Sequence, residues 1–192
     1  MIDISCIPND TPLKIIIGAG SQSWENWVPT QGEDLNLLKE QDWSQSFQDR
    51  RIDSLLCEHV WEHLTIDEAL EAAERCFRYL RPGGYLRCAV PDGFFPDPEY
   101  QKMSQVGGPG PIDHPAADHK TLHTYKTFVP IFEKAGFIVD LLEYCDERGR
   151  FHYNQWDHKE GPIYRSLLLD HRNKDGKIEF VSLIIDAQKP LS

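Results

Sequence analysis

Long apolar runs are missing from this sequence of 192 residues; the longest reach only a few residues. A membrane-spanning helix needs about 20 of them, so we expect no membrane partner. The first residues lack the basic stretch and apolar core of a secretory signal, which favours a cytoplasmic protein. Basic residues are scarce, 20 against 31 acidic ones, giving a formal net charge of −11. Such a surface repels phosphates, so we expect no nucleic-acid partner.

Paired cysteine motifs are also absent. The five cysteines are Cys6, Cys57, Cys76, Cys88 and Cys145, an odd number without a CxxC pair. This spacing is typical of reduced thiols in a cytoplasmic protein and does not indicate a zinc knuckle.

What the sequence does contain is an alternation of strand and helix patterns. Buried strands are predicted over 13–17, 52–57, 85–90, 137–144 and 178–187, and little helix is expected over 21–51. This order predicts an α/β fold: a Rossmann-like, doubly wound and mostly parallel sheet, with an antiparallel C-terminal strand. We expect one domain over 1–192, with irregular loop insertions at about 91–123 and 146–177.

The clearest helix follows the second of these strands. Thr65 is a good N-cap, and Glu68, three residues later, completes a capping box. Apolar residues then recur at helical spacing until Pro82-Gly83-Gly84 ends the helix. A second helix is predicted from about Thr124 to Ala135.

A glycine turn, Gly18-Ala19-Gly20, ends the first strand. Glycines let the backbone approach a ligand at the carboxyl end of a strand, where open α/β sheets bind ligands. A strand-to-loop turn without a ligand fits the same residues, since the third glycine of the dinucleotide fingerprint is missing.

The middle of the chain adds two phrases, Glu58-His59-Val60-Trp61-Glu62-His63-Leu64 and, after the predicted helix, Leu80-Arg81-Pro82-Gly83-Gly84-Tyr85-Leu86. Together with the glycine turn they resemble the class I S-adenosylmethionine-dependent methyltransferase family, and within it a small bacterial branch. The resemblance spans roughly residues 13–145, and the strand at 178–187 fits the antiparallel last strand of that family. It implies a methyltransferase fold, S-adenosylmethionine as cofactor and an enzymatic function.

The resemblance also implies a set of cofactor-binding residues. The glycine turn would face the methionine part of the cofactor, and the residues after the 52–57 strand would line the same end. The acidic ribose-binding residue of the family falls near Thr30 or Gln31, both neutral, and a shifted loop would bring Glu33 or Asp34 there instead. The resulting candidates are Gly18, Ala19, Gly20, Gln31, Asp34, Cys57, Glu58 and His59.

Two departures from the family pattern leave a second interpretation open. The ribose position is neutral, and only residues 18–25 connect the first strand to the second one expected at 26–29. A parallel crossover usually takes a dozen or more residues. The alternative is a methyltransferase-like binding or scaffolding protein without catalytic activity.

The catalytic step has three candidate residues, all of which follow the strand at 85–90 in the sequence. Asp92, His119 and His123 carry groups that accept protons near neutral pH, which an acceptor hydroxyl or amine requires. The alternatives are a turn residue at Asp92 and a hydrogen-bonding network of histidines that orders the loop. The N-P-P-Y phrase of the enzymes that methylate amino groups of nucleic acids does not occur. We therefore expect an unidentified small-molecule or sugar-type acceptor.

The segment His59-Val60-Trp61-Glu62-His63 matches H-x-x-E-H, an inverted zinc-protease motif. The motif needs both histidines on one face of a long helix, with a third ligand from His114, His119 or His123. Here the helix pattern starts only at Thr65, so we expect no metal site.

Overall fold

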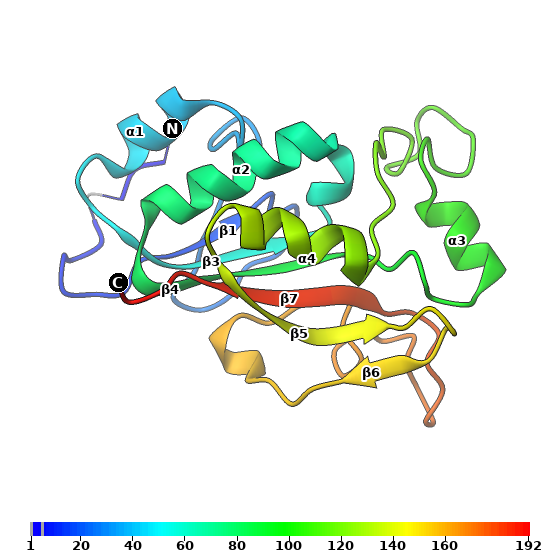
Figure 1. Ribbon diagram of the computed structural model, residues 1–192. Helices are drawn as coiled ribbons and strands as arrows, with labels where there is room; N and C mark the ends of the chain where they lie inside the picture. Colours follow the sequence, from blue (N-terminus) through cyan, green and yellow to red (C-terminus); the bar gives the residue numbers. More distant parts are fainter. Residues whose placement is uncertain (1, 5) are drawn as a thin grey trace.

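The computed structural model describes residues 2–4 and 6–192 and contains a seven-stranded sheet of order β2-β1-β3-β4-β7-β5-β6 (Figure 1). In chain order, the strands, α-helices and two 3-10 helices are β1 (Lys14–Ile17), β2 (Val28–Pro29), α1 (Glu40–Phe47), β3 (Ile52–Glu58), η1 (Trp61–His63), α2 (Ile66–Tyr79), β4 (Leu80–Pro91), α3 (Pro98–Ser104), α4 (Tyr125–Lys134), β5 (Ile138–Cys145), β6 (Phe151–Tyr153), η2 (His158–Glu160) and β7 (Ser182–Gln188). Strands β1 to β5 share one direction, while β6 and β7 run against them. This confirms the predicted α/β sheet and its antiparallel last strand.

The two faces of the sheet are covered differently. Helices α1, α2 and α4 lie over one face, where Ile15 and Leu55 pack in the larger apolar core (Figure 1). The neighbouring side chains Ile16 and Leu56 point to the other face, because successive side chains of a strand alternate. There they meet Trp156, which lies in the irregular connection 154–181. A connection without α-helix thus packs on this face of the sheet.

Helix α2 begins where the sequence predicts it. The Thr65 side chain accepts a hydrogen bond from the Glu68 N–H, and the Glu68 carboxylate accepts one from the Thr65 N–H, which completes the capping box. The helix ends at Tyr79, and β4 starts at once with Leu80, which pairs with Ile52. Strand β4 therefore begins at Leu80, earlier than the predicted start at residue 85.

Two helices lie where little helix or a loop was expected. In α1, Trp43 and Phe47 pack their rings on Tyr79 of α2, with centroids 5.3 Å and 6.0 Å away. No N-cap side chain marks the start of this helix, so tertiary packing rather than local sequence decides it. Helix α3 is capped by Asp97, whose carboxylate accepts the Tyr100 N–H, inside the connection expected to be irregular.

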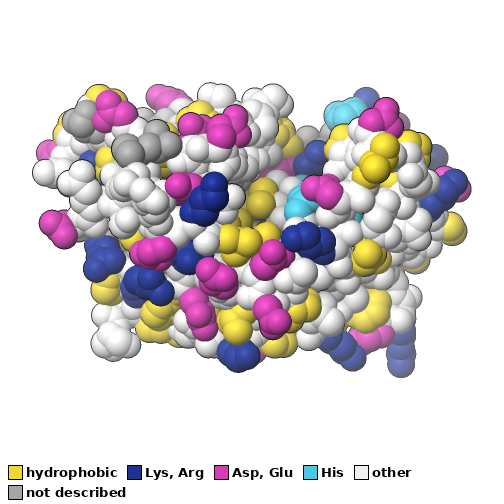
Figure 2. Space-filling model, turned by 90° about the horizontal axis from the view of Figure 1, so that it is seen from above, with side chains coloured by type: hydrophobic (Ala, Val, Ile, Leu, Met, Phe, Trp, Pro, Cys, Tyr) yellow, Lys and Arg dark blue, Asp and Glu magenta, His cyan; other side chains and the backbone are white. Residues whose placement is uncertain are grey.

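The helix-covered face has a mixed charge pattern. Figure 2 shows acidic and basic side chains interspersed over it, and histidine side chains on the side of α3 and the connection that follows. Apolar side chains are visible between them without forming one continuous patch. The histidines are therefore the feature that distinguishes this side of the molecule.

Candidate functional site

The candidate site lies at one edge of the sheet. The carboxyl ends of β1, β3 and β4 meet there, and so does the amino end of β7, because β7 runs antiparallel. This is the edge at which open α/β sheets bind ligands. Gly18 and Asp92 directly follow β1 and β4, and Glu58 is the last residue of β3, so the sheet brings these predicted site residues to one edge.

The glycine turn after β1 has a left-handed backbone at two residues. Gly18 has φ +62° and Gly20 has φ +55°, and a Cβ added to Gly18 would lie 2.6 Å from Val60 Cγ2. The Gln31 side chain holds the turn: its Oε1 accepts the Gly20 N–H at 3.2 Å and its Nε2 donates to the Gly20 carbonyl at 2.8 Å. The Ala19 N–H donates to the Thr30 carbonyl at 2.8 Å. Gln31 thus fixes the turn from the end of β2.

The nearby acidic candidate, Asp34, does not replace Gln31. Its carboxylate accepts the backbone N–H of Gln31 at 3.2 Å and so supports the segment that carries this residue. Gln31 and Asp34 therefore work as a pair that positions the glycine turn.

Glu58, at the end of β3, is enclosed by two segments far away in the sequence. Its carboxylate accepts hydrogen bonds from Gln22 Nε2 at 2.7 Å, from the Tyr164 N–H at 2.8 Å and from the Arg165 N–H at 3.0 Å. Burial raises the pKa of Glu58, although Arg165 and these donors oppose the shift. Segment 164–165 is thus part of the site. The sequence offered only an aromatic and polar stretch there, without a period that would have pointed to it.

His59 has a left-handed backbone, with φ +56°, which is uncommon for a residue other than glycine. Its Nε2 lies 2.9 Å from Ser182 Oγ, and its Nδ1 lies 3.3 Å from the Glu62 carboxylate. Burial, Arg165 and neighbouring histidines hold the pKa of His59 well below its usual range, so the imidazole is neutral. Backbone strain of this kind is concentrated at functional sites.

Two polar atoms beside this edge are buried without a hydrogen-bond partner among the described residues. They are Gln22 Oε1 and Trp24 Nε1, one acceptor and one donor. Gln22 also bonds to Glu58, and the Trp24 ring packs on Tyr164 with a centroid distance of 4.7 Å. A buried polar atom without a partner is costly, so these atoms fit a polar ligand bound next to the glycine turn.

Other predicted site residues are held in the interior. The Asp92 carboxylate is fully buried and accepts the N–H groups of Phe94 at 2.8 Å and Cys145 at 2.6 Å. Burial raises the pKa of Asp92 to about 6. Asp92 thus links the carboxyl ends of β4 and β5. The Cys57 thiol is also fully buried, in the core on the helix-covered face.

The two predicted histidines have different surroundings. His123 is 1% exposed, its Nε2 lies 2.9 Å from Thr121 Oγ1, and burial lowers its pKa to about 4. It orders the connection before α4. His119 instead lies beside Glu62 and His63, a group whose side chains could hold a metal ion. Burial raises the pKa of Glu62 to about 8, because this carboxylate has few compensating partners.

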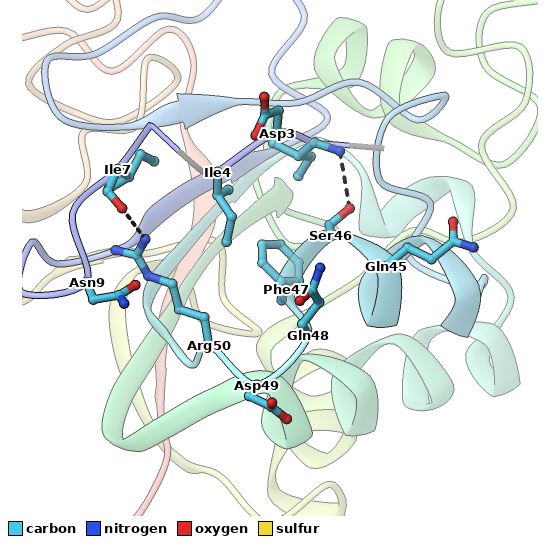
Figure 3. Close-up of a pocket in the computed structure, with 11 residues that line it drawn as sticks. Asp3, Ile4, Ile7, Asn9, Gln45, Ser46, Phe47, Gln48, Asp49 and Arg50 are labelled. Carbon is cyan, nitrogen blue, oxygen red and sulfur yellow. Dashed lines mark hydrogen bonds between the residues drawn. The ribbon is translucent and has the colours of Figure 1, made fainter.

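Cavities also occur away from this edge. One is lined by the N-terminal residues and by the segment from Gln45 to Arg50, where Arg50 Nη1 donates to the Ile7 carbonyl at 2.7 Å (Figure 3). Another lies between Phe95 and Phe151. The residues of the glycine turn line neither of these two cavities.

Comparison with known proteins identifies a related domain. A family model described as a methyltransferase domain matches residues 21–88. A SAM-dependent methyltransferase from Archaeoglobus fulgidus superposes with a TM-score of 0.53 at 15% identity, covering 94% of this chain and 87% of that one. A chain from the complex between the Haloferax volcanii Trm112 methyltransferase activator and a methyltransferase gives 0.52 at 13%, covering 94% and 82%. The shared feature is the fold.

The chain spans only about a third of the length of other proteins that it matches. An O-methyltransferase family protein from Burkholderia thailandensis, with a TM-score of 0.47 and 13% identity, is matched over 86% of this chain, which spans only 36% of that protein. No curated protein matches the chain in sequence. Over the residues that the structure describes, no helix combines the length and apolar character needed to cross a membrane.

Proposed function

We propose that the chain is a class I S-adenosylmethionine-dependent methyltransferase, which transfers the methyl group of S-adenosylmethionine to a small-molecule or sugar-type acceptor. The methyltransferase-domain match over residues 21–88 and the shared fold support this proposal. The observation that carries this proposal is the glycine turn after β1, fixed by Gln31 and facing the end of β3. The sulfonium of the bound cofactor supplies the activated methyl group.

The residues of the edge divide into two groups in this proposal. Those that hold the cofactor are Gly18, Ala19, Gly20, Gln31, Asp34, Glu58 and His59, with Cys57 contributing only backbone. The left-handed glycines let the backbone approach a ligand, and Gln22 and Trp24 offer it an unpaired acceptor and donor. The acceptor lies on the side of His119, while Asp92 and His123 keep the strand ends and the loop in place.

The net charge and the free cysteines bear on the acceptor class and on the location of this reaction. The net charge of −11 disfavours a nucleic-acid acceptor, and the five free cysteines fit a reducing, cytoplasmic location. A small neutral or cationic acceptor therefore fits this protein better than a polyanion.

The test is calorimetric binding of S-adenosylmethionine and S-adenosylhomocysteine, combined with a melting curve. Ligand at about 100 times its dissociation constant stabilises a protein by about 2.7 kcal/mol. For a chain of this size, that raises the melting temperature by about 5–10 °C. Gln31→Ala frees the glycine turn and weakens binding, whereas Gln41→Ala, at an exposed glutamine in α1, leaves it unchanged.

The second candidate function is a binding or scaffolding protein without catalysis. It is favoured by the Trp24 ring, which packs on Tyr164 beside the glycine turn where the family has its first helix. No binding of either ligand at millimolar concentration would reject methyl transfer and favour this candidate.

A further inference from the structure

Three side chains from η1 and from the connection after α3 converge at one point. Glu62, His63 and His119 each offer a ligand atom, and the three atoms lie within 4.8 Å of one another. Glu62 is 1% exposed and His119 is 8% exposed, whereas the His63 side chain is 29% exposed and connects the group to solvent. The group is therefore enclosed on one side and accessible on the other.

The Glu62 carboxylate has no hydrogen-bond donor among the described residues. Both of its oxygens are buried and unpaired, and the nearest basic group is the neutral imidazole of His59, at 3.3 Å. The charged form of a carboxyl group without partners is costly in the interior, and a bound cation relieves this cost. Glu62 is thus an unsatisfied ligand whose oxygens lie beside two imidazoles.

Each of the two histidines has an oxygen atom close to its Nδ1. His119 Nδ1 lies 3.0 Å from the Ser104 carbonyl, which can only accept, so Nδ1 carries the proton and Nε2 keeps its lone pair. His63 Nδ1 lies 2.8 Å from the Asp118 carboxylate, without the alignment of a full hydrogen bond. Carbonyl or carboxylate partners of this kind orient metal-binding histidines.

The backbone keeps the group together. The N–H groups of Lys120 and Thr121 both donate to the Glu62 carbonyl, at 2.8 Å and 3.1 Å. His119 therefore lies next to η1 although 56 residues separate it from His63. Little reorganisation is needed to bring the three side chains around an ion.

We propose that Glu62, His63 and His119 bind a divalent transition-metal ion of the zinc type. Two imidazoles and one carboxylate suit zinc, whereas magnesium and calcium prefer oxygen ligands alone. Three protein ligands leave a fourth position for an oxygen ligand such as water or an acceptor hydroxyl. His59 contacts Glu62 through Nδ1 and Ser182 through Nε2, and it is not part of the group of three converging ligand atoms, so the site differs from the H-x-x-E-H motif.

The site does not depend on methyl transfer, so the two proposals can be tested separately. Chelator-treated protein is titrated with Zn²⁺ by calorimetry and with Co²⁺ by absorption spectroscopy. The wild type is expected to bind one equivalent and to show the visible bands of Co²⁺ with nitrogen and oxygen ligands. Absence of one stoichiometric site overturns the proposal, whatever the outcome with S-adenosylhomocysteine.

Variants distinguish ligands from neighbours. His119→Ala weakens Zn²⁺ binding by more than about 100-fold, and Asp118→Asn weakens it by about 10-fold through His63. The matched control is His171→Ala, because that side chain is 86% exposed. Equal affinity in His119→Ala and the wild type contradicts the proposal.

Glu62→Gln separates a lost ligand from a lost fold. It keeps the size of the side chain but removes a ligand oxygen, so the metal-free protein should melt near the wild-type temperature while Zn²⁺ binding is weakened. A misfolded variant would instead show a lower melting temperature. A Glu62→Gln variant that binds Zn²⁺ as tightly as the wild type would overturn the assignment of this ligand.

Discussion

At the scale of single residues, Gly18 and Gly20 share a left-handed backbone but have different surroundings. A Cβ at Gly18 would lie 2.6 Å from Val60 Cγ2, while a Cβ at Gly20 would meet no atom within 4 Å. Both substitutions pay the backbone cost of about 1–2 kcal/mol, and only the first also overpacks Val60.

We predict that Gly18→Ala lowers the free energy of unfolding by about 1–3 kcal/mol more than Gly20→Ala does. Urea denaturation of both variants measures the difference. Val60→Ala in the Gly18→Ala background should remove most of the excess, because it deletes the methyl group that clashes. Equal destabilisation by the two glycine variants would show that the Val60 contact relaxes freely.

Glu143 is a residue whose charge state couples to stability. Its side chain is fully buried and accepts hydrogen bonds from Trp156 Nε1 at 3.0 Å and the Leu167 N–H at 2.8 Å. Burial raises the pKa of Glu143 to about 7, above its usual value. The folded state therefore binds the proton of the Glu143 carboxyl group more tightly than the unfolded state does. The protonated side chain stabilises the fold at low pH, and this stabilisation is lost as the pH rises through 7.

We predict that Glu143→Gln flattens the decline in the free energy of unfolding between about pH 4.5 and 7 by about 1–3 kcal/mol. Urea denaturation across this pH range gives the slopes of the variant and the wild type. Glu133→Gln, at an exposed glutamate in α4, should keep the wild-type slope. An unchanged slope in Glu143→Gln means that Glu143 titrates normally.

At the scale of elements, one arginine holds the connection 154–181 to the sheet. Arg87 of β4 is 3% exposed, and its Nη1 donates to the carbonyls of Asp157, Glu160 and Gly161. Its Nε and Nη2 bind the Asp186 carboxylate, both at 2.7 Å. A planar guanidinium can serve these partners at once, which explains how a segment without α-helix stays on the sheet.

We predict that Arg87→Lys lowers the free energy of unfolding by about 2 kcal/mol. A lysine keeps the positive charge but has a single nitrogen in place of the three guanidinium nitrogens that donate these hydrogen bonds. Limited proteolysis should then cut between residues 154 and 165 earlier than in the wild type. Arg148→Lys, at an exposed arginine, serves as the control. A wild-type cleavage pattern in Arg87→Lys would assign the anchoring to Trp156 and Ile163 instead.

Elements also differ in how far they could be predicted. Helix α2 was confirmed from its first turn, because the Thr65–Glu68 capping box is a local signal. Helix α1 was missed, since its stability comes from Trp43 and Phe47 against Tyr79 and from Arg75, which bonds both Glu40 and the Leu37 carbonyl. Such contacts join residues more than 30 positions apart, and no local pattern reveals them.

At the scale of the whole molecule, the two faces of the sheet predict unequal local stability. Helices α2 and α4 cover the larger core, whereas the irregular connection 154–181 packs on the other face. Segments with few regular hydrogen bonds open at a lower free energy than a packed core does. The connection 154–181 should therefore open before the sheet.

Hydrogen exchange tests this prediction. Amides in 154–181 should exchange faster than those of β3, β4 and α2. S-adenosylhomocysteine should slow the amides of Tyr164 and Arg165, which donate to Glu58, and leave the Arg150 amide in the β5–β6 turn unchanged. Uniform exchange over both faces would show that the molecule opens as one unit.

The sequence alone determined the central strands β1, β3, β4 and β5, the capped helix α2, the glycine turn and the family resemblance, because these depend on neighbouring residues and periodic burial. It did not reveal β6, and it placed the start of the last strand at 178 rather than at Ser182. Only the tertiary structure decided which side chains form the site. In the folded chain, the Tyr164 and Arg165 N–H groups donate to Glu58, and the Gln31 side chain bonds to Gly20. His119 lies beside Glu62. These contacts join segments 11 to 107 residues apart, and the packing of the whole chain sets them.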